Sequence, residues 1–162
     1  MVGTSTDPVM FSPGAAATRG TILTVLHRMA GSPDASNFAN PFGDVAPGAW
    51  YADAVTWAAA IGIVAGVADA GLPAGQAGEG SAGEGSFDPN APITRQDLVA
   101  MLSRYADHMG MTLPTVRDYP GFIDDADIAN YAKEAIERFF RAQIIGGYPD
   151  GDFKPQGEAT RA

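Results

Sequence analysis

Apolar side chains recur at helical spacing in four stretches of the chain. Residues three, four and seven positions apart share one face of an α-helix, and such a face is normally buried. Two stretches are equivalent at a shift of 76 positions, namely Ile22, Val25, Leu26, Met29 and Leu98, Met101, Leu102, Tyr105. The other two are equivalent at a shift of 81 positions, namely Ala54, Val55, Ala58, Ile61 and Ala135, Ile136, Phe139, Ala142. The pattern predicts four helices whose apolar faces form the core, and therefore an all-α fold.

A short motif stands before each of the two helices related by the shift of 76 positions. It consists of a Phe, a Pro two positions later, and a Thr-Arg pair seven and eight positions after the Phe. It occurs three times, in residues 11–19, 87–95 and 153–161. Thr is a favourable N-cap, and the Arg would then be the first helical residue. The pairs are Thr18-Arg19, Thr94-Arg95 and Thr160-Arg161. Recurrence at wide intervals indicates a repeat architecture.

The helices and motifs divide the single domain, residues 1–162, into repeated units. A complete unit, residues 42–106, holds an Asp-containing turn, a first helix, a loop, the Phe-x-Pro motif and a second helix. Residues 11–31 correspond to the second half of a preceding unit, and residues 122–162 to the first part of a further unit. A glycine-rich insert at 72–86 interrupts the complete unit, and we expect it to be a flexible loop.

The two incomplete units leave two expectations open. The chain is a fragment of a longer protein, or residues 11–30 close onto residues 122–162. The second alternative predicts two whole lobes and a contact between the N-terminal helix and the helix at 131–142. Residues 1–30 lack a basic start followed by an apolar run, so a leader peptide would lie outside this sequence.

Charge and composition exclude several classes of function. The chain has 10 basic and 19 acidic residues, a net charge of -9, which argues against binding to a nucleic-acid backbone. It has no cysteine, and no apolar run approaches the length of a membrane-spanning helix. His27 and His108 have no catalytic constellation around them, and His27 should be half-exposed. The acidic run 124–127 lacks the glycine and glutamate of a calcium loop. We therefore expect a protein without catalysis, metal or cofactor.

The repeated unit resembles the S-layer homology module. The residues that carry the likeness are Phe42-Gly43-Asp44, Trp50, Gly62-Ile63-Val64-Ala65-Gly66, Gly147-Tyr148-Pro149-Asp150-Gly151-Asp152-Phe153-Lys154-Pro155 and the three Thr-Arg pairs. The likeness covers nearly the whole chain apart from the first ten residues and the insert. It implies a pseudo-threefold helical spindle that anchors exported proteins to secondary cell-wall polysaccharide, often pyruvylated, in the bacterial envelope. A cargo domain on a longer chain is a further implication.

This sequence departs from the family pattern at several places. Gly20-Thr21 and Gln96-Asp97 follow the first two Thr-Arg pairs where the family has Ala-Glu. Tyr131 stands at the position of Trp50, and residues 67–71 replace the loop that reads Gly-Tyr-Pro-Asp-Gly in the last unit. The first copy should therefore lack part of its polar network, and the middle loop is the most altered.

The Thr-Arg pairs are the predicted binding residues. A guanidinium beside the unpaired N–H groups of a helix start would receive a carboxylate, such as that of a pyruvyl ketal or a uronic acid. The alternative is that Thr only caps the helix and Arg pairs with a nearby acid. In that case the repeats serve assembly or interaction with partner chains, without glycan binding.

Further candidate contacts come from the turns and from the start of the first helix. Trp50 and Tyr131 would stack on a sugar ring or fill the core as ordinary aromatics. Asp44, Asp125 and Asp150 would accept hydrogen bonds from sugar hydroxyls or from their own backbone turns. The resemblance adds the loop glycines Gly66 and Gly147 to the predicted groove. Each groove should combine a Thr-Arg start with an aromatic residue of an adjoining unit.

Overall fold

The computed structural model describes residues 5–6, 9–10, 12–65 and 85–161. These residues form four α-helices, α1 (Arg19–Met29), α2 (Ala52–Ala60), α3 (Arg95–His108) and α4 (Asn130–Arg141), and a short 3-10 helix, η1 (Asp125–Asp127). The strands β1 (Ser5–Thr6) and β2 (Val9–Met10) pair antiparallel, with Ser5 opposite Met10. The prediction of an all-α fold is confirmed. Gly66, Phe11 and most of the insert, up to residue 84, lie outside the described residues.

Thr side chains cap the two helices that follow a Thr-Arg pair. Thr18 and Thr94 have extended backbones, and each Oγ1 accepts a 3.2 Å hydrogen bond from the N–H three residues later, in Thr21 and Asp97. Both predicted helix starts are confirmed. At the C-terminal end of α2, Gly62 has a φ of +78°, a left-handed conformation that glycine adopts readily.

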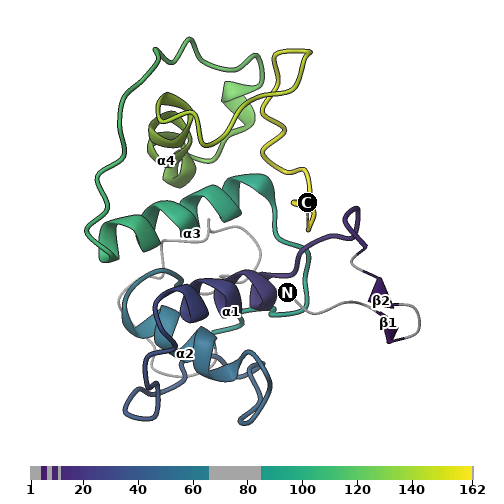
Figure 1. Cartoon of the computed structure of the whole chain (residues 1–162), viewed down its shortest axis with the longest axis vertical. Helices are drawn as coiled ribbons and strands as arrows, with labels where there is room; N and C mark the ends of the chain where they lie inside the picture. Colours follow the sequence, from purple (N-terminus) through teal and green to yellow (C-terminus); the bar gives the residue numbers. More distant parts are fainter. Residues whose placement is uncertain (1–4, 7–8, 11, 66–84, 162) are drawn as a thin grey trace.

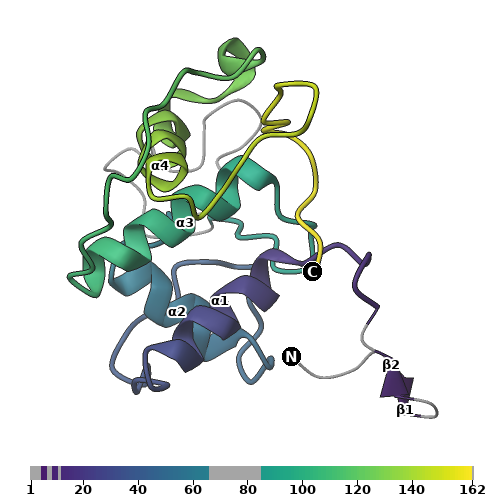
Figure 2. The same cartoon turned by 45° about the horizontal axis from the view of Figure 1, so that its top comes forward.

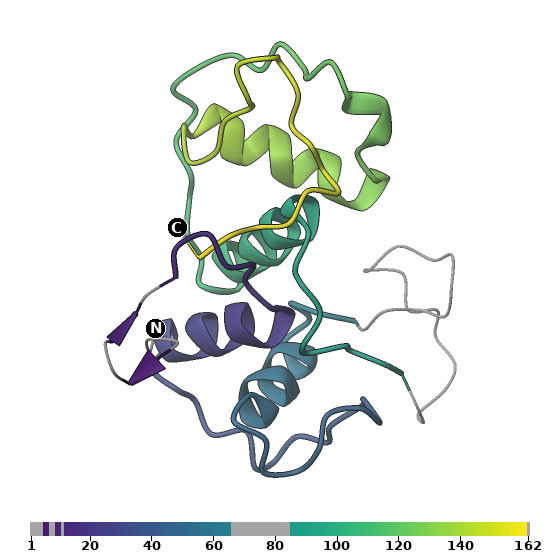
Figure 3. The same ribbon diagram turned by 90° about the vertical axis from the view of Figure 1, so that its right-hand side faces the viewer.

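The helices lie in layers, with α3 between α4 on one side and α1 with α2 on the other (Figures 1 and 3). α1 packs against α2, and α3 packs against α4. In terms of the expected units, the second helix of one unit is therefore paired with the first helix of the next unit along the chain. The alternative in which residues 11–30 close onto residues 122–162 predicts that the N-terminal helix contacts α4; this part of that alternative is wrong, because α3 lies between α1 and α4 (Figure 1).

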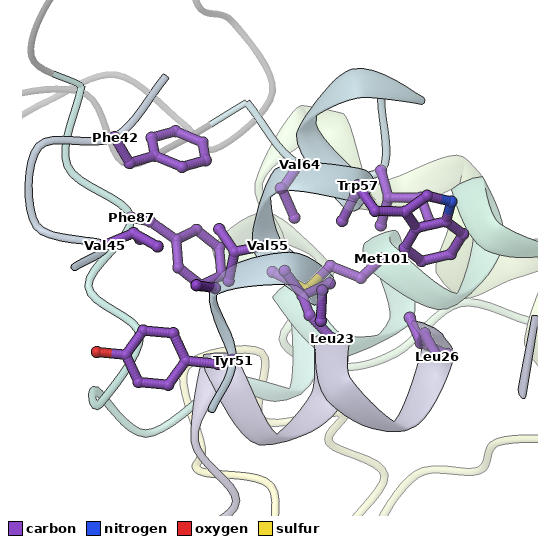
Figure 4. Packing of buried hydrophobic residues seen from close by; sticks show 14 of the residues in the cluster. Leu23, Leu26, Phe42, Val45, Tyr51, Val55, Trp57, Val64, Phe87 and Met101 are labelled. Atoms are coloured by element: carbon purple, nitrogen blue, oxygen red, sulfur yellow. The ribbon is translucent and has the colours of Figure 1, made fainter. Parts of the chain in front are cut away.

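Two hydrophobic clusters share α3. Met101 and Tyr105 of α3 belong to the cluster around α1 and α2, which also contains Leu23, Val55 and Phe87 (Figure 4). Val99 of α3 belongs to the second cluster, which contains the buried side of α4 and Phe153, and Leu102 packs against both clusters. α3 is thus the element that joins the two halves of the core.

The buried face of α1 differs from the predicted one. Met29 is 62% exposed, whereas Leu23, which the pattern did not select, is fully buried beside Leu26. The face that meets α2 is centred on Leu23, and Met29 lies about 240° further round the helix. The equivalent face of α2 is close to the prediction, since Ala54, Val55 and Ala58 are buried.

The three Thr-Arg segments are joined in a closed cycle of backbone contacts. Isolated antiparallel bridges connect Thr18 with Pro92, Thr94 with Glu158, and Thr160 with Ala16. In each case the N–H of the Arg donates to a carbonyl of the next segment, from Arg19 to Ala91, from Arg95 to Gly157 and from Arg161 to Ala15. Figure 2 shows the last described residues beside the start of α1. Residues 15–17 therefore do meet residues 159–161, although α1 and α4 do not pair.

Candidate functional site

The helix starts differ from the predicted anion receptor in one respect. The first N–H groups of α1 donate to Ala91 O, Pro89 O and Thr18 Oγ1, and those of α3 donate to Gly157 O, Pro155 O and Thr94 Oγ1. The expectation of unpaired N–H groups at these two starts is wrong, because carbonyls of the neighbouring unit satisfy them. A carboxylate at either site would have to be received by the guanidinium.

Arg19 is a buried residue of the inter-unit contact. Its Nε donates a 2.8 Å hydrogen bond to Phe87 O, and its guanidinium carbon lies 4.7 Å from the centre of the Phe87 ring. Its Nη1 lies 3.5 Å from the carboxylate of Asp97, and the whole residue is 4% exposed. Desolvation lowers the pKa of Arg19, and the nearby Asp97 opposes that change. Arg19 is therefore largely removed from solvent.

Tyr131 completes the small pocket around Arg19. Its hydroxyl donates to the carboxylate of Asp97 and accepts a 3.1 Å hydrogen bond from Gln96 Nε2. Desolvation and the negative charge of Asp97 raise the pKa of Tyr131. The free volume is only about 10 Å³. The residues around it are Arg19, Val64, Ala65, Asp97, Ala100, Met101, Arg104 and Tyr131.

Arg95 bonds the equivalent backbone carbonyl, that of Phe153, but is more exposed than Arg19. Its Nε donates to Phe153 O at 2.9 Å, and its Nη2 donates to Gly146 O at 3.2 Å. The guanidinium carbon lies 4.8 Å from the Phe153 ring centre and 5.0 Å from that of Tyr148. The residue is half-exposed and faces a cavity of about 380 Å³. The cavity is lined by Arg95, Leu98, Val99, Leu102, Ile144, Ile145, Gly146, Tyr148, Phe153, Glu158, Ala159 and Thr160.

The third Thr-Arg pair is only partly in this site. Thr160 lines the cavity beside Arg95, so a Thr of the last unit and an Arg of the middle unit come together. Arg161 is half-buried, and its N–H donates to Ala15 O at 3.0 Å. The cavity is thus lined by the Arg of the second pair, Arg95, and by the Thr of the third pair, Thr160.

The turn carboxylates hold the Phe-x-Pro motifs. Asp44 accepts hydrogen bonds from Phe87 N, Asp88 N and Ser86 Oγ at 2.6 to 2.8 Å. Desolvation would raise the pKa of Asp44, but these hydrogen bonds outweigh it and lower the pKa. Asp88 has a φ of 54°, a left-handed conformation that is uncommon for residues other than glycine. Asp44 therefore has a structural partner in the next motif.

The equivalent of Asp44 is Asp124, which the sequence reasoning missed. Asp124 accepts from Phe153 N and Lys154 N, both at 2.7 Å, and Lys154 has a φ of 58°. The signal was present, because Asp44 and Asp124 each follow a Phe by two residues. Asp125 instead bonds Tyr119 and Lys133.

The remaining candidates have the following places. Asp150 accepts from Asp152 N and Lys154 Nζ, which is a turn-making role. Trp50 is 62% exposed and is not the core aromatic of the alternative prediction; Tyr51 and Trp57 are buried there instead. Gly147 is required sterically, since a Cβ there would lie 2.7 Å from Phe122. His27 is half-buried as predicted, and its Nε2 donates to Pro33 O.

Two other residues of the Arg95 cavity were not singled out as contacts. Tyr148 stacks near the guanidinium, and Gly146 supplies the carbonyl that orients it. Both lie in or beside the Gly-Tyr-Pro-Asp-Gly loop. The position of this loop against α3 depends on the pairing of α3 with α4, which sequence spacing does not give.

Two segments of the chain match a known protein family. Residues 41–70 and 122–162 match the sequence model described as the S-layer homology domain. The resemblance to the S-layer homology family is confirmed. The matched segments contain α2 in one case and η1, α4 and the third Thr-Arg pair in the other. S-layer homology domains are non-catalytic anchoring modules, so these segments indicate association with the cell surface or cell wall.

Several curated proteins are similar over most of this chain. An amylopullulanase of Thermoanaerobacterium thermosulfurigenes is 26% identical over 94% of the chain, which corresponds to 7% of that protein. An endoglucanase of Bacillus sp. (strain KSM-635) is 27% identical over 98% of the chain and 15% of its own length. Cell surface glycoprotein 1 of Acetivibrio thermocellus is 26% identical over 94% of the chain and 6% of its own length. The chain therefore spans a small part of these relatives.

The described residues contain neither a candidate membrane span nor a candidate metal cluster. None of the helices there is both long and apolar enough to cross a membrane. Across residues 12–65 and 85–161, no group of three or more His, Cys, Asp and Glu side chains is arranged to hold a metal ion.

Proposed function

We propose that this chain anchors a surface protein to the bacterial cell wall by binding an acidic secondary cell-wall polysaccharide at the Arg95 cavity. The observation that carries the proposal is a half-exposed guanidinium at the edge of a cavity of about 380 Å³. That size lies within the range of small-molecule sites, roughly 300–1,000 Å³. A pyruvylated sugar is the preferred ligand, because its carboxylate suits the guanidinium.

The surroundings of Arg95 support an oriented rather than a mobile cation. Hydrogen bonds to Phe153 O and Gly146 O use two of the five N–H groups and fix the plane of the guanidinium. Tyr148 and Thr160 add an aromatic face and a hydroxyl to the cavity. Fixing an Arg in advance reduces the entropy lost when it binds a carboxylate.

We also propose the pseudo-threefold spindle and the division into units 11–31, 42–106 and 122–162. The closed cycle of three equivalent Thr-Arg segments supports this arrangement. Trp50, Asp125, Asp150 and Arg161 are retained as proposed glycan contacts in the grooves related by that symmetry. The enzyme names of two relatives support a cargo domain on a longer chain.

Binding to purified cell-wall sacculi tests the function. We expect the wild type to co-sediment with sacculi, Arg95→Ala to lose most of this binding, and Arg95→Lys to recover only part of it. Arg28→Ala is the matched control, because Arg28 is an exposed arginine on α1 and its loss changes the net charge equally. Mild acid treatment of the sacculi, which hydrolyses ketals, should abolish binding. Unchanged binding of folded Arg95→Ala would contradict the proposal.

A second candidate function is docking of a partner chain. The Arg95 cavity has an apolar side formed by Leu98, Leu102, Ile144 and Ala159, and Ile144 is 52% exposed. This apolar side of the cavity would contact an apolar surface of a partner chain more favourably than it would contact a sugar. Sedimentation velocity of the wild type and Ile144→Asp distinguishes the two candidates. Self-association that Ile144→Asp abolishes, with wall binding absent in both proteins, favours the interaction role.

A further inference from the structure

Arg19 and Arg95 occupy equivalent places in successive units. Each Nε donates to the carbonyl of the motif Phe in the following unit, Phe87 for Arg19 and Phe153 for Arg95. Each guanidinium lies over that Phe ring, at 4.7 and 4.8 Å. Each also faces an equivalent loop, which holds Val64 and Ala65 in one case and Ile145 and Gly146 in the other. The chain thus contains two versions of one guanidinium site.

The two versions differ in what stands in front of the guanidinium. Around Arg95 the space is about 380 Å³, whereas around Arg19 it is about 10 Å³. In the smaller pocket the carboxylate of Asp97 is 3.5 Å from Arg19 Nη1, and the Asp97 side chain is only 15% exposed. A carboxylate therefore already occupies the position in which Arg19 would meet an acid.

Both carboxylate oxygens of Asp97 have a partner in the pocket. One oxygen accepts from the Tyr131 hydroxyl, while the other faces Arg19 at a distance longer than a good hydrogen bond. Arg104 also lines the pocket and is held by its own bond to Ile63 O. The carboxylate of Asp97 thus has one guanidinium and one phenol as its side-chain partners in the pocket.

We infer that the Arg19 pocket is a second carboxylate-binding site whose resident ligand is the side chain of Asp97. Replacing Asp97 by Ala removes a carboxylate and leaves a space of similar size beside a buried cation. An unpaired buried charge is strongly destabilising, so a small carboxylate from solution should enter and restore stability. The inference rests on the proposed function only in taking a carboxylate as the kind of ligand that enters from solution.

Chemical rescue tests this inference. We would measure the melting temperature of Asp97→Ala in increasing sodium formate, with sodium chloride at equal ionic strength as the reference. A dissociation constant on the order of 10 mM predicts a rise of about 3–6 °C at roughly 100 mM formate. The wild type and Asp97→Asn should show no formate-specific rise, because their pockets remain filled. Equal responses to formate and chloride, or a response of Asp97→Asn equal to that of Asp97→Ala, would overturn the inference.

The test remains decisive if Asp97→Ala does not fold. Formate should then restore the helical circular dichroism signal, and failure of formate to do so where the wild type is folded overturns the inference. The readout involves no glycan, so failure of wall binding at Arg95 would leave it unaffected. Restored wall binding in Arg95→Ala/Asp97→Ala, relative to Arg95→Ala alone, would join the two proposals.

Discussion

The side chain of Arg19 donates a 2.8 Å hydrogen bond to the carbonyl of Phe87, a residue 68 positions later in the chain. The arrangement is repeated by Arg95 and Phe153, at 2.9 Å. In both cases an arginine at the first position of a helix contacts the motif of the following unit. These arginines therefore have a structural role between units in addition to any role in binding.

The two arginines should differ in their contribution to stability. Arg19→Ala removes a buried hydrogen bond and the partner of Asp97, and we expect a loss of about 2–4 kcal/mol in the free energy of unfolding. Arg95→Ala removes one part-buried and one exposed hydrogen bond and leaves no buried charge without a partner, so we expect a loss of about 1 kcal/mol or less. Urea denaturation of the two variants and the Arg28→Ala control measures the difference. Equal losses for Arg19 and Arg95 would contradict the assignment of different environments.

Asp44 should make stability depend on acid pH. Its pKa is lower in the folded state than its ordinary value of 3.8, so the unfolded chain takes up the proton first as the pH falls. The stabilisation is complete at neutral pH and should be lost as the pH falls from about 5 through the folded-state pKa. Asp44→Asn should be less stable than the wild type at pH 7, and the gap should narrow towards low pH. A gap that stays constant between pH 7 and pH 3 would exclude this role.

Gly20 should not tolerate a larger side chain. A Cβ there would lie 2.9 Å from Pro89 O and 3.3 Å from Cγ of Tyr51. Gly20→Ala should therefore cost about 1–3 kcal/mol through overpacking, despite the higher helix propensity of Ala. Gly14→Ala is the control, because a Cβ at Gly14 meets nothing within 4 Å. Thermal melts of both variants provide the measurement, and a Gly20→Ala protein as stable as the wild type would refute the expectation.

Tyr131 should be coupled to Asp97. Its hydroxyl bridges the carboxylate of Asp97 and the amide of Gln96, and Tyr131→Phe leaves both without this partner. We expect a loss of about 1–2 kcal/mol. A double-mutant cycle with Asp97→Asn should give a coupling energy of about 1 kcal/mol. Additive losses would show that the two side chains stabilise the fold independently.

The helices were predictable because the repeat supplies the same local signals twice. Thr18 and Thr94 cap their helices through the same bond, and the apolar stripe of α2 recurs in α4. Local propensity and periodicity agree in these elements, so the pattern decides the structure. The third Thr-Arg pair shows that the motif also determines pairing between segments. Thr160 joins the cycle of segments without a described helix after it.

The site was less predictable because its chemistry depends on pairing between units. The sequence predicts that the backbone N–H groups of Arg19 and Arg95, as first residues of helices, have no partner. In the structure, carbonyls more than 60 positions away accept hydrogen bonds from them. Asp125 is predicted in place of Asp124, and the shift of 81 positions that relates the two helices also pairs Asp44 with Asp125, whereas in the turn the equivalent residue is Asp124. Met29 was placed in the core because spacing gives the period of a helix and not the direction of its neighbour.

The cycle that links Thr18, Thr94 and Thr160 has a consequence for unfolding. Detaching any one segment releases its backbone bonds to both of the others, so the two helix pairs have no independent boundary at which to separate. We therefore expect one cooperative melting transition, and amide protons of Arg19, Arg95 and Arg161 that exchange with solvent at a common slow rate.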